Sequence, residues 1–286
     1  MTPVALALVL ASAVAHATWN LMAKRVARGL AFNWLFDAVS VALYAPLALG
    51  AALAERPTVG PLEVVFVVGS ALLHLAYFAL LLRGYRSGDL SVVYPLARGV
   101  GPMLSTLAAV ALLGERPTPG ALVGAVFIGA GVVVLTGSPR RLTEPTSGRP
   151  VLYALTTGGL IAAYTLWDKH AVTLGRLSPL VYFWGFTAVR AALLTPVALR
   201  CWDEVRVTWR WHRREAIGVG ILSPLSYVLV LSALAVSPVS YVAPAREIGI
   251  LLGAAMGSRL LAEGHGPRRL SAAAAMVVGV ALLATH

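Results

Sequence analysis

The sequence predicts an all-α integral membrane protein whose ten transmembrane helices form two inverted five-helix repeats. Three observations lead to this prediction: an apolar composition, a series of helix-length apolar runs, and an internal duplication. With 58% hydrophobic and only 12% charged residues, and a mean hydropathy of +0.80, the 286-residue chain has too little polar surface to cover a soluble globule. Composition alone therefore places most of the chain in a lipid bilayer.

A helix that crosses a bilayer needs about 20 apolar residues. Ten stretches of the chain reach this length, and short connections rich in Pro, Gly and Arg separate them. The predicted spans are residues 3–23, 32–53, 62–82, 90–113, 118–137, 151–170, 178–199, 216–236, 239–261 and 268–285. We do not expect the first span to be a signal peptide, because no basic segment precedes it and the sixth span repeats it.

The duplication is clearest where residues 91–120 are echoed by residues 240–269, at an offset of 148 positions. The offset pairs Arg98 with Arg246 and Glu115 with Glu263, whereas Pro95 and Pro244 are out of step by one residue. We therefore predict a first repeat over 1–137, a linker over 138–150 and a second repeat over 151–286. An odd number of spans per repeat makes the second copy enter the membrane from the opposite side.

The basic residues indicate topology rather than a nucleic-acid partner. The net charge is +11, but the cations lie between apolar runs and form no patch interleaved with aromatic residues. Odd-numbered connections hold 16 Lys and Arg and even-numbered ones only 4. The positive-inside rule then places odd connections in the cytoplasm and both termini outside. Cys201 stands alone and no Cys/His cluster has metal-ligand spacing, so we expect neither a disulfide nor a cofactor.

The sequence resembles the drug/metabolite transporter superfamily, specifically its bacterial EamA-type members. The resemblance rests on the ten spans, the five-span repeat, the pairs Trp19-Asn20 and Trp167-Asp168, and the proline-containing fourth span with its Gly-Glu and Pro turn. It implies a ten-span transporter of the bacterial cytoplasmic membrane, as monomer or homodimer, without specifying the substrate. Several ten-span members keep both termini in the cytoplasm, which is opposite to the orientation that the charge count predicts.

Arg98 and Arg246 are the leading candidates for substrate binding. They occupy related positions in the two repeats, and a guanidinium held in a bilayer can bind an anion with two hydrogen bonds. The alternative is that the two arginines neutralise Asp37 and Glu247 and fix helix register. Because Glu247 directly follows Arg246, the sequence favours Arg98 as the arginine that meets a substrate. Arg190 has no repeat partner and ranks below both.

Polar stripes on other spans supply further candidates. Residues three and four apart share a helical face, which groups His16 with Trp19 and Asn20, and His74 with Tyr77. The remaining predicted substrate-binding residues are Tyr94, Trp167 and Tyr227. For proton coupling the candidates are Asp37 and Glu247, since an intramembrane carboxylate is costly, and His16 and His74, since histidine changes charge near neutral pH. A packing role is the alternative for each histidine, and interfacial anchoring is the alternative for Trp167.

Three classes of function fit such a chain. A secondary transporter explains the repeat and the intramembrane charges, and no phosphate-binding loop for ATP is present. A membrane-embedded enzyme would need a nucleophile with a base, or a metal cluster, and neither motif occurs. A channel or structural subunit does not need charges of both signs. We therefore expect alternating access for a small zwitterionic or anionic metabolite, amino acids first, with proton coupling as an option and organic cations as the alternative substrate.

Overall fold

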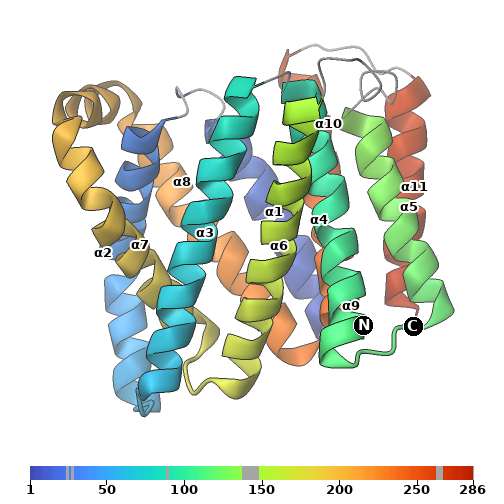
Figure 1. The fold of residues 1–286 in the computed structure, drawn as a ribbon, viewed down its shortest axis with the longest axis horizontal. Coiled ribbons are helices and arrows are strands. Elements are labelled where there is room, and N and C mark those ends of the chain that lie inside the picture. The colour runs from blue at the N-terminus through green and yellow to red at the C-terminus, as the bar shows by residue number, and fades with distance from the viewer. Residues whose placement is uncertain (24–25, 27–28, 88–89, 137–147, 262–266, 286) are drawn as a thin grey trace.

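The computed structural model describes residues 1–285 apart from 24–25, 27–28, 88–89, 137–147 and 262–266. Regular structure in these residues is helical throughout, which confirms the predicted all-α class (Figure 1). The helices are α1 (Pro3–Ala23), α2 (Leu30–Glu55), α3 (Pro61–Ser87), α4 (Leu90–Leu113), α5 (Pro119–Thr136), α6 (Gly148–Leu174), α7 (Pro179–Arg200), α8 (Trp202–Val236), α9 (Val239–Ala245), α10 (Ile248–Leu261) and α11 (Pro267–Ala284).

Most predicted spans coincide with one helix, and their limits agree within a few residues. Five described helices are long and apolar enough to cross a membrane: α1, α2, the Pro61–Leu81 part of α3, α7 and α8. Shorter apolar helices cover Ala97–Leu113, Pro119–Val134 and Ser271–Ala284. Hydropathy identified these elements because a helix facing lipid must be apolar along its whole length.

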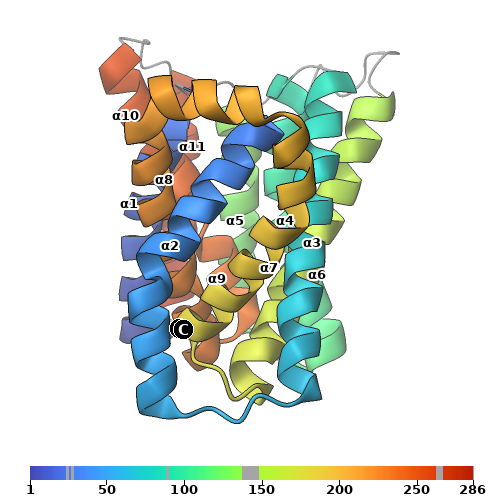
Figure 2. The same ribbon diagram turned by 90° about the vertical axis from the view of Figure 1, so that its left-hand side faces the viewer.

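Two predicted spans differ from the structure. The eighth helix begins at Trp202 rather than at residue 216, and its axis bends at His212, where φ is −127° and ψ is 28°. The part before this bend crosses the top of the bundle in Figure 2. The predicted ninth span is divided into α9 and α10. Pro244 disturbs the helix here, because it has no amide hydrogen to donate and its ring clashes with the preceding turn.

The helices run up and down in one bundle, and both termini lie at the same end, at the bottom of Figure 1. We call this the lower end; the upper end is where α1 stops and α2 begins. The amino group of Met1 lies 3.5 Å from the carbonyl oxygen of Leu283, so the two termini are adjacent. Helix α1 packs on α8 and α10, α6 packs on α3 and α4, and α2 packs on α7.

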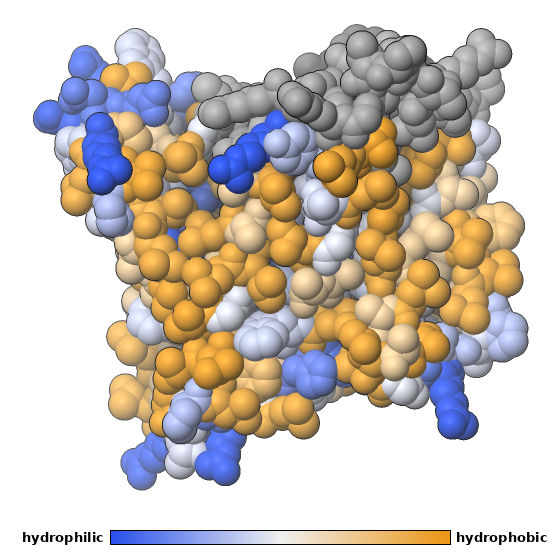
Figure 3. Space-filling view, in the orientation of Figure 1, coloured by the Kyte–Doolittle hydropathy of each residue, from blue (hydrophilic) through white to orange (hydrophobic). Residues whose placement is uncertain are grey.

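The sides of the bundle are apolar and its two ends are polar. Hydrophobic side chains cover the middle of the face in Figure 3, with hydrophilic groups along its upper left and lower edges. Many large aliphatic side chains are exposed on the sides, and Leu53 and Leu112 are each 76% exposed. Exposing so many of them to water would be unfavourable. Such a surface is that of a multi-pass membrane protein surrounded by acyl chains.

Helices α5 and α11 form the closest helix pair, and glycine makes that approach possible. A Cβ atom on Gly279 would lie 2.6 Å from the carbonyl oxygen of Gly124, and a Cβ on Gly124 would lie 2.7 Å from that of Gly279. Contacts this short with backbone atoms are not found in proteins, so each glycine is required by the other helix. Both helices stand at one edge of the bundle, away from α2 and α7 (Figure 1).

We predict that Gly279→Ala lowers the free energy of unfolding by about 1–3 kcal/mol, because the added methyl group forces α5 and α11 apart. Thermal unfolding of the purified protein in detergent measures this loss. Gly50→Ala is the matched control, since nothing lies within 4 Å of a Cβ at that helical position. An equal effect of the two substitutions would show that the pair does not depend on this contact.

Candidate functional site

A cavity of about 240 Å³ lies between the helices of the two halves of the chain. Its lining comes from α1, α2, α3, α4, α6, α7 and α8 and from the break between α9 and α10. The lining reaches Ala23 and Gly29, at the end of α1 and just before α2, so the cavity extends toward the upper end. The predicted residues that line it are His16, Trp19, Asn20, His74, Tyr77, Arg98, Tyr227 and Arg246.

The predicted polar stripe of α1 faces this cavity. His16 and Trp19 are in edge-to-face contact, with ring centroids 4.9 Å apart. The amide nitrogen of Asn20 donates to the carbonyl oxygen of His16 over 2.9 Å. One turn lower, the hydroxyl of Ser12 donates to the carbonyl oxygen of Ser226 over 2.8 Å and thereby ties α1 to α8. The stripe therefore serves both the cavity wall and the contact between the two halves.

Asp37 is paired with an arginine that the sequence ranked low. Arg190 on α7 binds it with two hydrogen bonds, Nε to Oδ2 over 2.7 Å and Nη2 to Oδ1 over 2.5 Å. The Asp37 side chain is fully buried and that of Arg190 is 15% exposed. The expectation that Arg98 or Arg246 neutralises Asp37 was therefore wrong. Sequence spacing could not reveal this pair, because the two residues are 153 positions apart.

The partners of the two repeat-related arginines are also the reverse of those expected. The Nε atom of Arg98 lies 3.3 Å from Oε2 of Glu247, and both side chains are buried. Arg246 instead places its guanidinium carbon 5.5 Å from the centroid of the Tyr227 ring. In the described part of the chain Arg246 takes part in no ion pair.

The break at Pro244 explains this exchange of partners. The amide of Glu247 bonds to the carbonyl of Pro244 over 3.0 Å, and that of Gly249 bonds to Arg246 over 3.1 Å, so the chain passes through a tight turn of the 3₁₀ type. Consecutive side chains in such a turn point about 120° apart. Glu247 reaches toward α4 while Arg246 reaches toward α8.

Asp168 on α6 forms the most extensive polar network in the described residues. Its carboxylate accepts hydrogen bonds from Ser70 over 2.7 Å, from Tyr182 over 2.7 Å and from Tyr227 over 2.5 Å. The donors belong to α3, α7 and α8. His74 adds to the network, since its Nε2 atom lies 3.2 Å from the Tyr227 hydroxyl and 4.0 Å from Asp168 Oδ2.

His74 is held between aromatic rings inside the cavity. It stacks on Tyr164 at 4.4 Å and on Phe186 at 5.1 Å, measured between ring centroids. Its Nδ1 atom lies 2.9 Å from the carbonyl oxygen of Ser70. A carbonyl oxygen only accepts, so Nδ1 carries the hydrogen and Nε2 faces Tyr227. This orientation directs the titratable nitrogen toward Asp168.

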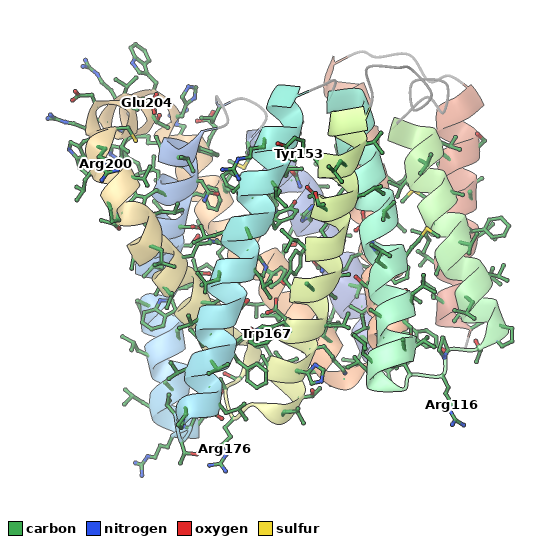
Figure 4. All side chains as sticks on the ribbon, viewed as in Figure 1. Arg116, Tyr153, Trp167, Arg176, Arg200 and Glu204 are labelled. Atoms are coloured by element: carbon green, nitrogen blue, oxygen red, sulfur yellow. The ribbon has the colours of Figure 1, made fainter. Side chains whose placement is uncertain are left out.

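One predicted substrate-binding residue, Trp167, is not brought to the cavity. Trp167 lies between α6 and α3, where its indole nitrogen donates to the carbonyl oxygen of Phe66 over 2.9 Å and its ring packs on Gly69. Figure 4 shows Trp167 in the lower half of the bundle. The side chain of Tyr94 lies outside the described residues. Asp37 and Glu247, predicted for proton coupling, do not line the cavity, and each is paired with an arginine.

Polar contacts between separate elements lie at the lower end. The carboxylate of Glu115 accepts hydrogen bonds from the amides of Val239 over 2.7 Å and Ser240 over 2.9 Å, at the start of α9. The ammonium group of Lys169 donates to the carbonyl oxygens of Leu234 over 2.6 Å and Ser237 over 3.1 Å, where α8 ends. Each charge satisfies backbone groups that a helix terminus leaves unpaired.

Sequence reasoning missed Asp168 as a site residue. The repeat offset had placed it opposite Asn20, and its neighbour Lys169 suggested a position at the membrane interface. The available signal was the charge itself, directly after a stretch, residues 151–167, that contains only apolar, aromatic and hydroxyl side chains. Arg190 carried the same signal. A charged residue within a span is a stronger indication of a site than the presence of a matching residue in the other repeat.

The fold and the cavity define a class: a multi-pass helical membrane protein with a polar site enclosed at the centre of its bundle. The model of the EamA-like transporter family matches residues 3–137, just under half of the chain, so this part of the chain is similar to that family of membrane transporters. One solved crystal structure superposes with a TM-score of 0.78 over 99% of this chain and 96% of the other. At 16% identity this likeness shows the fold alone. No curated protein matches the chain.

We predict that Arg190→Met destabilises the protein by about 3–5 kcal/mol, because it leaves the charge of Asp37 buried without a partner. Adding Asp37→Asn to the same variant should restore much of the loss, since the amide needs no counter-charge. Thermal unfolding of the two single variants and the double variant gives the coupling between them. Additive losses would show that the two residues act independently.

Proposed function

We propose that the chain is a secondary active transporter that moves a small zwitterionic or anionic metabolite across the membrane by alternating access. One observation carries this proposal: Arg98, Arg190 and Arg246 line a single cavity, whereas no Asp or Glu is among its described lining residues. Two of these arginines are balanced by carboxylates behind the wall, Glu247 and Asp37. The guanidinium of Arg246 remains to attract an anion.

The rest of the lining suits the organic part of such a substrate. Tyr164, Phe183, Phe186 and Tyr227 supply aromatic surface, and His74 and Asn20 supply polar contacts. A cavity of about 240 Å³ is below the usual range for drug-sized ligands and fits a compact metabolite. An amino acid would place its carboxylate at Arg246 and its side chain among the rings. A cationic substrate, the alternative, lacks a lining carboxylate to bind.

The contacts between helices support two inverted halves of five spans, 1–137 and 151–286, joined by 138–150. The most extensive contacts of α1 and α4 have counterparts with the halves exchanged: α1 with α8 corresponds to α6 with α3, and α4 with α6 corresponds to α10 with α1. In Figure 1 α1 rises from the lower end, while α6 descends from the upper end. Such an arrangement allows two related states that expose the same site to opposite sides.

The charge distribution supports a cytoplasmic upper end in a bacterial inner membrane, with both termini outside. Arg200 lies at the upper end beside Glu204, and Arg116 and Arg176 lie at the lower end (Figure 4). The first part of α8 adds Arg206, Arg210, Arg213 and Arg214 at the upper end, together with exposed Trp209 and Trp211. In this orientation the cavity reaches the cytoplasm and Glu115 lies at the external end.

The test is a binding panel on purified protein, with amino acids, other small anions and quaternary amines, followed by uptake into proteoliposomes. We expect Arg246→Ala to abolish binding of the zwitterionic or anionic compound that the panel identifies, because its carboxylate loses the guanidinium. Arg116→Ala is the control: it removes an exposed cation at the lower end and should leave binding unchanged.

Two results would contradict the proposal. Binding of quaternary amines alone would assign the cavity to organic cations. Equal binding by Arg246→Ala and the wild type would show that this arginine only packs against Tyr227.

A further inference from the structure

We propose that Asp168, Tyr227 and His74 together form one proton-binding site, through which the transporter couples substrate movement to the proton gradient. This inference rests on the transport function proposed above and names its coupling residues. The carboxylate at its centre is Asp168, and the two proton-coupling carboxylates that the sequence suggested, Asp37 and Glu247, have a different role.

Asp37, Glu247 and Asp168 are buried carboxylates with different surroundings. Asp37 binds the guanidinium of Arg190 with two hydrogen bonds, and Glu247 faces Arg98 at 3.3 Å. A guanidinium stays protonated at any physiological pH and favours the ionised carboxylate beside it. Asp168 is also completely buried, but its three hydrogen-bond donors are neutral hydroxyls. Among these carboxylates, Asp168 is therefore the one that can gain a proton without breaking an ion pair.

The hydrogen atoms of the network leave room for one proton. With Asp168 ionised and Nδ1 of His74 donating to Ser70, the single hydroxyl hydrogen of Tyr227 goes to Asp168. An added proton can sit on Nε2 of His74, which then donates to the Tyr227 oxygen. It can equally sit on Oδ2 of Asp168, which donates to Tyr227 while the Tyr227 hydrogen turns to His74. The two forms differ only by shifts of hydrogens along this chain.

Neighbouring groups set the charge balance of the site. Ser70 on α3 contributes a neutral hydroxyl to the site. The titratable and charged side chains on the surrounding elements are Tyr77 on α3, Tyr164 and Lys169 on α6, Tyr182 and Arg190 on α7, Arg98 on α4, His16 on α1, and Arg246 and Glu247 between α9 and α10. Lys169 is directed to the end of α8 rather than to Asp168. Arg190 and Arg98 are paired with Asp37 and Glu247, whereas the guanidinium of Arg246 lies against the ring of Tyr227.

Tyr227 connects the proton site to the proposed substrate site. Its hydroxyl lies between Asp168 and His74, and the guanidinium of Arg246 lies over its ring. An anion that binds Arg246 neutralises the charge that lies against the Tyr227 ring and thereby favours uptake of a proton by the network. Substrate and proton then bind together and leave together. A proton that binds with its substrate allows the gradient to drive accumulation.

The first experiment needs no substrate. Infrared difference spectra of the wild type are recorded as the pH is lowered, and we expect the carbonyl band of a protonated carboxyl group to appear. Asp168→Asn should remove this band, and Asp37→Asn, the matched control, should retain it. A band that persists in Asp168→Asn would overturn the proposal.

The second experiment uses two matched tyrosines in case Asp168→Asn fails to fold. Tyr227 and Tyr182 both donate to Asp168, but only Tyr227 also contacts His74. In proteoliposomes loaded with the compound from the binding panel, Tyr227→Phe should lose accumulation driven by a pH gradient. It should keep exchange of labelled for unlabelled compound, because its ring still faces Arg246. Tyr182→Phe removes a donor to Asp168 but leaves the contact with His74, so it should lose less of the gradient-driven accumulation than Tyr227→Phe and should keep exchange.

The outcomes separate the two proposals. A carboxyl band assigned to Asp168 in a protein that moves none of the panel compounds would uphold the proton site and contradict the transport function. Transport that is equally dependent on the pH gradient in Tyr227→Phe and the wild type would uphold the function and overturn the proton site. Equal loss of gradient-driven accumulation in Tyr182→Phe would also overturn the site, since the relay through His74 would then be irrelevant.

Discussion

The interaction on which this structure most depends is the hydrogen bonding of one buried carboxylate. Asp168 has no exposed surface, and an ionised group in such a position is strongly unfavourable unless donors replace its water. Ser70, Tyr182 and Tyr227 supply those donors from three different helices. The need to supply hydrogen bonds to one carboxylate therefore holds α3, α7 and α8 around α6. It also positions His74 and Tyr227 in the cavity wall.

The other intramembrane charges follow the same rule with different partners. The pairs Arg190–Asp37 and Arg98–Glu247 each join an element of one half to an element of the other. Glu115 and Lys169 also act between elements, by satisfying backbone groups at the start of α9 and the end of α8. Under the alternating access that we propose, contacts that join the halves must change, so the two ion pairs and the contacts of Glu115 lie where we expect rearrangement.

Sequence periodicity predicted the elements well and the partners of each charge poorly. Helix limits follow from local apolar runs, and polar faces such as that of His16, Trp19 and Asn20 follow from the helical repeat. The break at Pro244 was predicted only in part. The proline indicated a disturbed backbone, but it did not indicate that Arg246 would face Tyr227 and Glu247 would face Arg98. Partner choice depends on the relative rotation of packed helices, as in the pairing of Arg98 with Glu247, 149 positions apart.

The sequence by itself determined the all-helical membrane class and the position of most helices. These properties are local, because each helix satisfies its own backbone and must be apolar toward lipid. Tertiary structure alone decided that Asp37 meets Arg190, that Arg246 faces Tyr227 and that Asp168 gathers hydroxyls from three helices. Such choices minimise the electrostatic free energy of a low-dielectric interior, and they depend on distances between helices that no local pattern contains.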